Sequence, residues 1–227
     1  MHAKSHFESK QVGVALVGGM HTVPHFPARG LYAITDGPRA DLLGVCEAAL
    51  RGGAAVLQYR DKTVDHARRR SEAAALVALC ARFRAPLIIN DDVELAASVG
   101  AAGVHLGEHD GDIAAARARL GDTAIIGVSC YDSLPRARAL ATAGADYLAF
   151  GAFFPSPTKP QARCATAELL SAARALRKPL VAIGGITPDN AAPLIAAGAD
   201  LIAAISGVFA VSDAEAAARR YNSFFYK

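Results

Sequence analysis

Eight short apolar segments alternate with eight stretches rich in Ala, Leu and Arg, and this alternation constrains the fold of the chain more than any other feature. The apolar segments span residues 31–35, 55–60, 86–91, 103–107, 124–129, 147–151, 179–185 and 201–206. The stretches of helical character span residues 42–51, 64–84, 94–99, 111–120, 134–143, 167–176, 191–196 and 213–225. The pattern predicts eight strand-plus-helix units.

The strand segments are nearly continuous apolar runs, which is typical of parallel strands covered on both faces. Gly and Ala dominate the helix-to-strand turns, as at residues 52–55, 100–103, 144–146 and 198–200. Eight such units in 227 residues predict one α/β domain, a closed (β/α)8 TIM barrel. A doubly wound open sheet is the alternative, but Thr-Asp-Gly-Pro at 35–38 stands where that fold would carry G-x-G-x-x-G.

Residues 1–28 differ from the rest, and we expect a disordered or irregular N-terminal extension before a barrel domain at 29–227. Met20 is an alternative start of the chain. A metal-binding tail is the other interpretation, because four of the seven histidines lie here, namely His2, His6, His21 and His25.

The overall charge and the cysteine pattern exclude several classes of protein. A net charge of +3 is no signature of nucleic-acid binding. No apolar run approaches the roughly 20 residues that cross a bilayer. Cys46, Cys80, Cys130 and Cys164 form no CxxC pair or zinc spacing. We therefore expect free thiols, a cytoplasmic location, and neither nucleic-acid nor membrane partners.

Charged residues close the second strand segment, in the run Gln-Tyr-Arg-Asp-Lys at 58–62. Because side chains alternate along a strand, Gln58, Arg60 and Lys62 share one face, and Tyr59 and Asp61 share the other. The opposite phase would press two cations against the helices, which is costly without partners. The first set is therefore predicted to point into the barrel mouth.

Two carboxylates, Asp91 and Asp110, end the third strand segment and follow the fourth. Oxygen ligands from neighbouring strand ends suit Mg²⁺, which takes one or two carboxylates and keeps waters and phosphate oxygens. A general acid–base pair is the alternative, but the facing cations favour metal and phosphate. Asp92 is expected to cap the next helix. His105 is as readily a core histidine as a functional one.

Hydroxyl groups and glycines follow the remaining strand segments. Backbone amides at Gly184-Gly185 and Ser206-Gly207 resemble the phosphate cradle of phosphate-binding barrels. The sequence therefore predicts two anion sites, a metal-bound pyrophosphate at strands two to six and a monophosphate at strands seven and eight. Other polar groups placed for these anions are Ser129 and, in a loop stiffened by Pro155, Pro157 and Pro160, the residues Ser156, Thr158 and Lys159.

Taken together, these motifs resemble thiamine phosphate synthase over roughly residues 31–209. The likeness rests on Leu-Tyr-Ala-Ile-Thr, Gln-Tyr-Arg-Asp-Lys, Ile-Asn-Asp-Asp-Val-Glu-Leu-Ala, Gly-Val-His-Leu-Gly-Glu-His-Asp, Gly-Val-Ser, Gly-Ala-Phe-Phe-Pro-Ser-Pro-Thr-Lys, Ala-Ile-Gly-Gly-Ile and Ala-Ile-Ser-Gly. The family joins 4-amino-2-methyl-5-hydroxymethylpyrimidine diphosphate to a thiazole monophosphate, which gives thiamine phosphate and pyrophosphate.

The resemblance implies a role for each matching residue. Asp91 and Asp110 would hold one Mg²⁺ per subunit. The thiazole phosphate would contact Ser156, Pro157, Thr158, Gly185, Ile205 and Ser206. The pyrimidine diphosphate would contact Gln58, Tyr59, Arg60, Asp61, Lys62, Asn90, Ser129 and Lys159. The catalytic residues among these would be Arg60, Lys62, Lys159 and Ser129.

The implied mechanism is dissociative, and the basic residues stabilise the leaving pyrophosphate. The departure from the family pattern at Ser156, where Thr is commoner, keeps the hydroxyl group.

Three rival functions remain. A thiazole tautomerase-like isomerase would not need the magnesium–pyrophosphate residues, and a non-catalytic phosphate-metabolite-binding barrel would show no turnover. Another phosphate-barrel enzyme would lack the two carboxylates. Small-molecule substrates are expected, and a homo-oligomer is possible.

Overall fold

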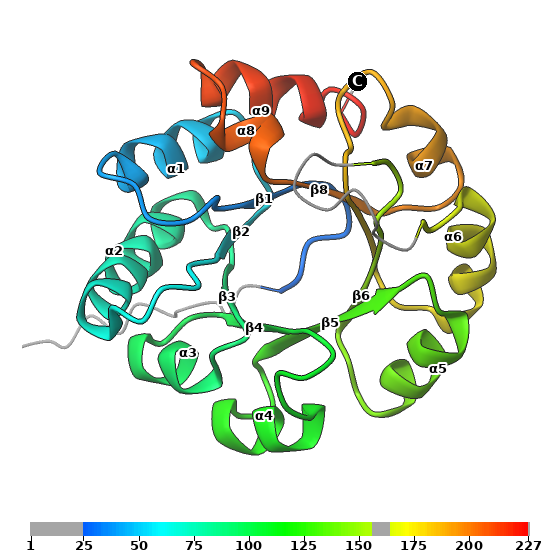
Figure 1. Ribbon diagram of the computed structural model, residues 1–227, viewed down its shortest axis with the longest axis horizontal. Helices are drawn as coiled ribbons and strands as arrows, with labels where there is room; N and C mark the ends of the chain where they lie inside the picture. The colour runs from blue at the N-terminus through cyan, green and yellow to red at the C-terminus, as the bar shows by residue number, and fades with distance from the viewer. Residues whose placement is uncertain (1–24, 156–163, 227) are drawn as a thin grey trace, which may run out of the picture.

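The computed structural model describes residues 25–155 and 164–226 and forms a closed barrel of eight parallel strands (Figure 1). Each strand pairs with its neighbour in the chain, and β1 pairs with β8 to close the ring. The TIM-barrel prediction is confirmed, and the open sheet is excluded. The strands are β1 Gly30–Ile34, β2 Val56–Tyr59, β3 Leu87–Asn90, β4 Gly103–Leu106, β5 Ile125–Tyr131, β6 Tyr147–Phe150, β7 Leu180–Ile183 and β8 Leu201–Ala204.

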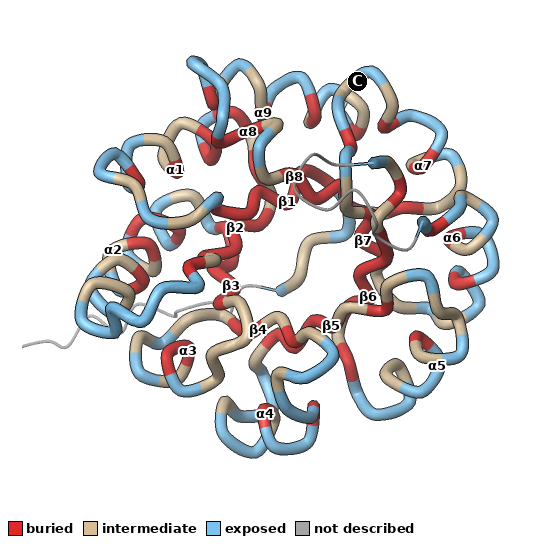
Figure 2. The backbone as a smooth tube through the Cα atoms, viewed as in Figure 1, coloured by how far each residue is buried: buried red, intermediate tan, exposed pale blue. Residues whose placement is uncertain are grey.

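The helices surround this ring and bury one face against it, so that buried and exposed positions alternate along each helix (Figure 2). One short helix, α8, follows β8 and lies outside the predicted set. The helices are α1 Leu42–Arg51, α2 His66–Phe83, α3 Val93–Val99, α4 Ile113–Leu120, α5 Leu134–Thr142, α6 Ala167–Ala173 with the 3-10 turn η1 Arg174–Leu176, α7 Ala192–Ala196, α8 Ser206–Phe209 and α9 Ala214–Asn222.

Local sequence signals set where the helices begin and end. The predicted cap at Asp92 is confirmed, because its side chain accepts a hydrogen bond from the Leu95 amide at 2.8 Å. Gly100 ends α3 with a φ of 67°, and Gly198 precedes β8 with a φ of 115°. These left-handed conformations suit glycine, so the chain turns from helix into strand without strain.

The barrel lumen is filled by side chains that alternate with those facing the helices. The lumen cluster comprises Tyr32, Ile34, Val56, Ile88, Ile125, Tyr147, Ala149, Val181, Leu201 and Ala203. Gly127 gives the Tyr147 ring its space, since a Cβ there would lie 1.8 Å from the Tyr147 Cζ atom. The lumen is therefore a packed core below the strand ends.

Phe26 extends the packed structure before β1. Its ring stacks on Tyr147 with centroids 4.1 Å apart and meets Tyr32 edge-on at 6.2 Å. Phe26 therefore packs on the lumen cluster as an apolar cover, and the domain boundary expected at residue 29 stays a prediction.

Three of the thiols are buried. Cys46, Cys80 and Cys130 are free, and burial raises the pKa of each to about 12. These thiols are therefore protonated at neutral pH and serve as packing groups. Within residues 25–155 and 164–226, every helix is too short or too polar to span a bilayer.

Candidate active site

The end of β2 presents the first group of predicted site residues. Gln58 is buried and points into the lumen, where its Nε2 atom donates to the Tyr32 hydroxyl at 2.7 Å. Arg60 is held through its backbone, because its amide donates to Thr35 Oγ1 at 2.8 Å and its carbonyl accepts from the same hydroxyl at 3.1 Å. Thr35 is fully buried. It ends the first apolar segment and was not among the predicted site residues.

Tyr59 and Asp61 face α2, as the alternation of side chains along β2 predicts. The Tyr59 hydroxyl donates to Glu72 Oε2 at 2.6 Å. The Asp61 carboxylate is buried, pairs with Arg68 Nη2 at 2.6 Å and accepts from the Thr63 amide at 2.8 Å. The family resemblance implied ligand contact for both residues, but their polar groups are engaged with α2. These contacts hold the segment that carries Arg60 and Lys62 against α2, and the ligand contact implied for Tyr59 and Asp61 stays a prediction.

The two predicted metal ligands lie together at the neighbouring strand ends. Lys62 Nζ is 3.3 Å from Asp91 Oδ2, and the Asp91 and Asp110 carboxyl groups interact side chain to side chain. Burial, and then the neighbouring Asp110, raise the pKa of Asp91 above its usual value, while Lys62 acts in the opposite direction. Asp110 Oδ2 also accepts from the Gly107 amide at 3.0 Å. Two adjacent carboxylates, with the pKa of Asp91 raised, favour a bound cation.

The turn at Asp91 aims this carboxylate. Its φ is 64°, in the left-handed region, and its amide donates to the His105 carbonyl at 2.8 Å. Such a conformation costs a non-glycine residue energy, and it persists here because β4 holds the backbone. Asn90, one residue earlier, is partly buried at the end of β3 and is in register with His105.

His105 and Ser129 meet inside the lumen. His105 Nε2 lies 2.9 Å from Ser129 Oγ, and His105 Nδ1 lies 2.9 Å from the Tyr147 hydroxyl. The interpretation of His105 as a hydrogen-bonded histidine of the lumen is confirmed, and a functional role stays a prediction. Sequence reasoning missed Tyr147 and Tyr32, because a tyrosine in an apolar run is indistinguishable from an ordinary core residue.

The ends of β7 and β8 carry the predicted phosphate cradle. Gly184 and Gly185 have φ values of 103° and 64°, and a Cβ at Gly185 would lie 2.8 Å from the carbonyl oxygens of Phe154 and Pro155. The two loops therefore pack backbone to backbone. Ile205 precedes α8, and Ser206 is the exposed first residue of that helix.

Part of the predicted site lies outside the described residues, namely Ser156, Pro157, Thr158 and Lys159. The described residues just before that loop lie beside the cradle, because the Phe154 amide donates to the Gly184 carbonyl at 3.0 Å. The loop therefore begins beside the predicted thiazole phosphate residues.

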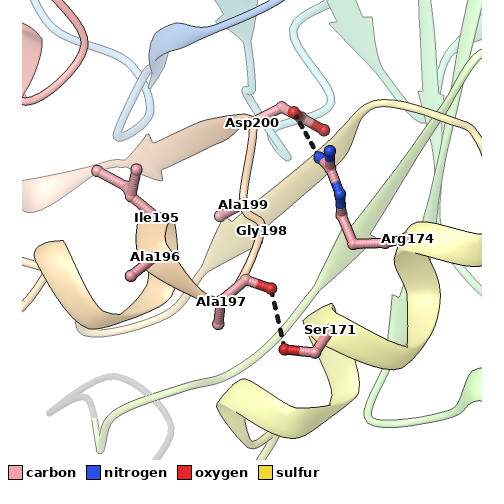
Figure 3. A pocket seen from close by; sticks show the side chains of 8 residues that line it. All are labelled: Ser171, Arg174, Ile195, Ala196, Ala197, Gly198, Ala199 and Asp200. Atoms are coloured by element: carbon pink, nitrogen blue, oxygen red, sulfur yellow. Dashed lines mark hydrogen bonds and ion pairs between the residues drawn. The ribbon is translucent and has the colours of Figure 1, made fainter.

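A hollow between α6 and α7 lies at the other end of the barrel, beside the turn that enters β8 (Figure 3). Its polar groups satisfy one another. Ser171 Oγ donates to the Ala197 carbonyl at 3.1 Å, and Arg174 Nη1 pairs with Asp200 Oδ1 at 3.1 Å. The Asp200 Oδ2 atom accepts from the Leu180 amide at 2.9 Å. These contacts hold the helices against the turn that enters β8, so the polar groups that line the hollow already have partners.

Comparison with known proteins agrees with this geometry. The family profile described as "Thiamine monophosphate synthase" matches residues 31–208. The chain belongs to this family. It is 54% identical over 207 residues to the thiamine-phosphate synthase of Methylobacillus flagellatus, covering 90% of this chain and 98% of the relative. It is 56% identical over 192 residues to that of Halorhodospira halophila, covering 84% and 91%.

A solved structure shares both the fold and the sequence pattern. The thiamine phosphate pyrophosphorylase from Pyrococcus furiosus superposes with a TM-score of 0.78 at 34% identity, covering 86% of this chain and 94% of that one. The resemblance read from the motifs is thereby confirmed, as is the assignment to the transferases of thiamine biosynthesis.

Proposed function

We propose that the mouth of this barrel joins 4-amino-2-methyl-5-hydroxymethylpyrimidine diphosphate to the thiazole monophosphate 4-methyl-5-(2-phosphoethyl)thiazole. The products are thiamine phosphate and pyrophosphate. One observation carries the proposal: Lys62 lies 3.3 Å from Asp91, whose carboxyl group adjoins that of Asp110. A lysine beside two carboxylates suits a magnesium-bound diphosphate, because the cation screens the carboxylates and the lysine meets the phosphate oxygens.

The donor set fits Mg²⁺. No group of three or more His, Cys, Asp or Glu that could hold a metal occurs among residues 25–155 and 164–226. This agrees with a cation that takes two carboxylates from the chain and fills its shell with water and substrate oxygens. Asp91 and Asp110 would hold it. When bound, Mg²⁺ would stabilise negative charge on the diphosphate.

The chain's own groups would bind and orient the pyrimidine diphosphate. Arg60 and Lys62 would contact the diphosphate, joined by Lys159, which lies outside the described residues. Ser129 would donate a hydrogen bond from the lumen side. Gln58 and Asn90 would border the pyrimidine at the strand ends.

The thiazole phosphate would lie at the ends of β7 and β8. Gly185 supports this role, since only a glycine lets the ends of β6 and β7 pack closely enough to build the cradle. Ile205 and Ser206 would complete the cradle, together with Ser156, Pro157 and Thr158, which lie outside the described residues.

The chemistry separates into two steps. The bond between the pyrimidine methylene carbon and the diphosphate oxygen breaks, its electron pair leaves with pyrophosphate, and the aminopyrimidine stabilises the methylene cation. The thiazole nitrogen then donates its lone pair to that carbon and forms the C–N bond. No general base is needed for a nitrogen lone pair. The main task of Arg60 and Lys62 is electrostatic, and such groups commonly contribute about 10²–10³ in rate.

The test is Mg²⁺-dependent release of pyrophosphate by wild type, Asp91→Asn and a matched control, Asp122→Asn. Asp122 is exposed in the turn before β5, at the far end of the barrel. Asp91→Asn is expected to lose about 10²-fold or more in kcat/KM, and Asp122→Asn is expected to match wild type.

A tautomerase-like isomerase or a binding protein would release no pyrophosphate at all. Equal turnover of wild type and Asp91→Asn would reject the metal role.

A further inference from the structure

A chain of hydrogen bonds crosses the lumen beneath the site and joins two of its predicted ligand-binding residues. Gln58 Nε2 donates to the Tyr32 hydroxyl at 2.7 Å, and that hydroxyl lies 2.7 Å from the Tyr147 hydroxyl. The Tyr147 hydroxyl lies 2.9 Å from His105 Nδ1, and His105 Nε2 lies 2.9 Å from Ser129 Oγ. Side chains from β2, β1, β6, β4 and β5 thus form one continuous path.

The first donor determines the direction of this chain. An amide nitrogen only donates, so the Tyr32 oxygen accepts from Gln58. If it also accepted from Tyr147, its own hydrogen would lack an acceptor among the described contacts, so Tyr32 donates to Tyr147. Tyr147 in turn directs its hydrogen to His105 Nδ1. A neutral imidazole carries one hydrogen, which must then be on Nε2 and point at Ser129 Oγ. Ser129 accepts this bond, and its own hydrogen remains for a ligand.

The direction of the chain requires a neutral His105 ring, with one hydrogen and one bare nitrogen. The ring lies in the lumen with a hydroxyl group 2.9 Å from each nitrogen. These hydroxyls, of Tyr147 and Ser129, are its polar side-chain contacts in the part of the chain that the structure describes. The Phe26 ring stacked on Tyr147 at 4.1 Å covers the lumen from the other end.

We propose that Tyr32, Tyr147 and His105 are positioning residues, which hold the His105 proton on Nε2 and so present Ser129 as a hydrogen-bond donor to the pyrimidine diphosphate. The part that concerns the substrate rests on the proposed function. The direction of the chain does not, because it follows from the contacts alone. A donor at Ser129 is the useful polarity, since diphosphate oxygens only accept.

The first experiment needs no substrate. Nitrogen NMR of protein labelled with ¹⁵N-histidine reports which ring nitrogen carries the proton, and His105→Asn identifies the His105 signals. The expected result at pH 7 is a neutral ring that is protonated on Nε2 and bare on Nδ1. Protonation on Nδ1 would overturn the proposal, because Ser129 would then have to donate to the ring.

The second experiment is a kinetic cycle of Tyr147→Phe and Ser129→Ala. Tyr147→Phe keeps the ring and removes the hydroxyl, so we expect about a tenfold loss in kcat, with the KM for thiazole phosphate unchanged. In the Ser129→Ala background the same substitution should cost less than about threefold, because the two residues act through one bond. Equal losses in both backgrounds would overturn the coupling.

Two further variants separate this role from general stability. If Tyr147→Phe does not fold, Tyr32→Phe takes its place. It cuts the hydrogen-bond chain one step earlier and leaves the Tyr147 hydroxyl, so we expect a smaller loss in kcat. Tyr226→Phe removes a hydroxyl that donates to the Arg29 carbonyl, just before β1 at the far end of the barrel, and should match wild type. If Tyr226→Phe lost as much kcat as Tyr147→Phe, the effect would be non-specific and the positioning role would be rejected. Absence of turnover in wild type would reject the proposed function and leave the NMR result standing.

Discussion

Removing Arg68 should destabilise the end of β2 by a large and predictable amount. The Asp61 carboxylate is 0% exposed, whereas its partner Arg68 is 29% exposed and also contacts Glu72 at 2.9 Å. Arg68→Ala therefore leaves the buried Asp61 carboxylate with the Thr63 amide but without its cation, and such losses cost up to about 3–5 kcal/mol. Asp61→Asn leaves Arg68 with water and Glu72, so it should cost only about 1–2 kcal/mol, the value of lost charge-assisted hydrogen bonds. Urea denaturation measures both.

The pH dependence of this cost provides a sharper test. Burial acts to raise the pKa of Asp61, but hydrogen bonds from Thr63 and Arg68 outweigh it and hold the pKa below its usual value. In wild type, the stability contributed by Asp61 is present above the unfolded pKa of about 4 and is lost as pH falls through the lower folded value. In Arg68→Ala the folded pKa should rise above the unfolded one. The gap to wild type should then be larger at pH 7 than near pH 4.

The same variant should impair the site, because Arg60 and Lys62 flank Asp61 in the segment after β2. We expect about a tenfold loss in kcat/KM for the pyrimidine diphosphate with little change in KM for the thiazole phosphate. Arg70→Ala, which changes an exposed arginine of the same helix, is the control. The reasoning is refuted if Arg68→Ala costs no more stability than Arg70→Ala, or if its cost is the same at pH 7 and pH 4.

Three further predictions concern the metal site and the lumen. Asp110→Asn removes the neighbouring carboxylate that, after burial, raises the pKa of Asp91. In Mg²⁺-free buffer at pH 7 it should therefore stabilise the fold by about 0.5–1 kcal/mol, although it should abolish turnover when Mg²⁺ is supplied. A melting temperature below that of wild type would contradict this. Gly127→Ala should destabilise by about 1–3 kcal/mol in urea titrations because it overpacks the lumen, whereas Gly44→Ala, with nothing within 4 Å inside α1, should stabilise by about 0.5–1 kcal/mol. Phe26→Ala should cost about 1.5–3 kcal/mol of stability because it uncovers the lumen, and a neutral result would show that this residue is not part of the core.

The sequence predicted the barrel well because each layer of the fold has a local signal. The first predicted helix, 42–51, matches α1 at both ends, and the predicted strand ends differ from the observed bounds by at most two residues. The carboxylate at Asp91 and the cation at Lys62 were predicted to meet because the ends of parallel strands converge on one face. The phase of Gln58 also followed from alternation along the strand.

What escaped prediction depends on contacts between distant segments. Tyr32 and Tyr147 are separated by 115 residues along the chain, and nothing local distinguishes their hydroxyls from those of other buried tyrosines. Asp61 lies in a matching motif, yet its partner Arg68 comes from the next helix. Phe26 precedes the first strand without any periodic pattern, so only the packed lumen reveals its place.

The most direct test of the central claim is the stoichiometry of product formation by the wild-type protein. Both substrates are supplied with Mg²⁺, and thiamine phosphate and pyrophosphate are quantified together by mass spectrometry over time. The account predicts equal amounts of the two products, none when either substrate is omitted, and none in EDTA. Pyrophosphate without thiamine phosphate in the complete mixture, or equal yields in EDTA, would contradict it.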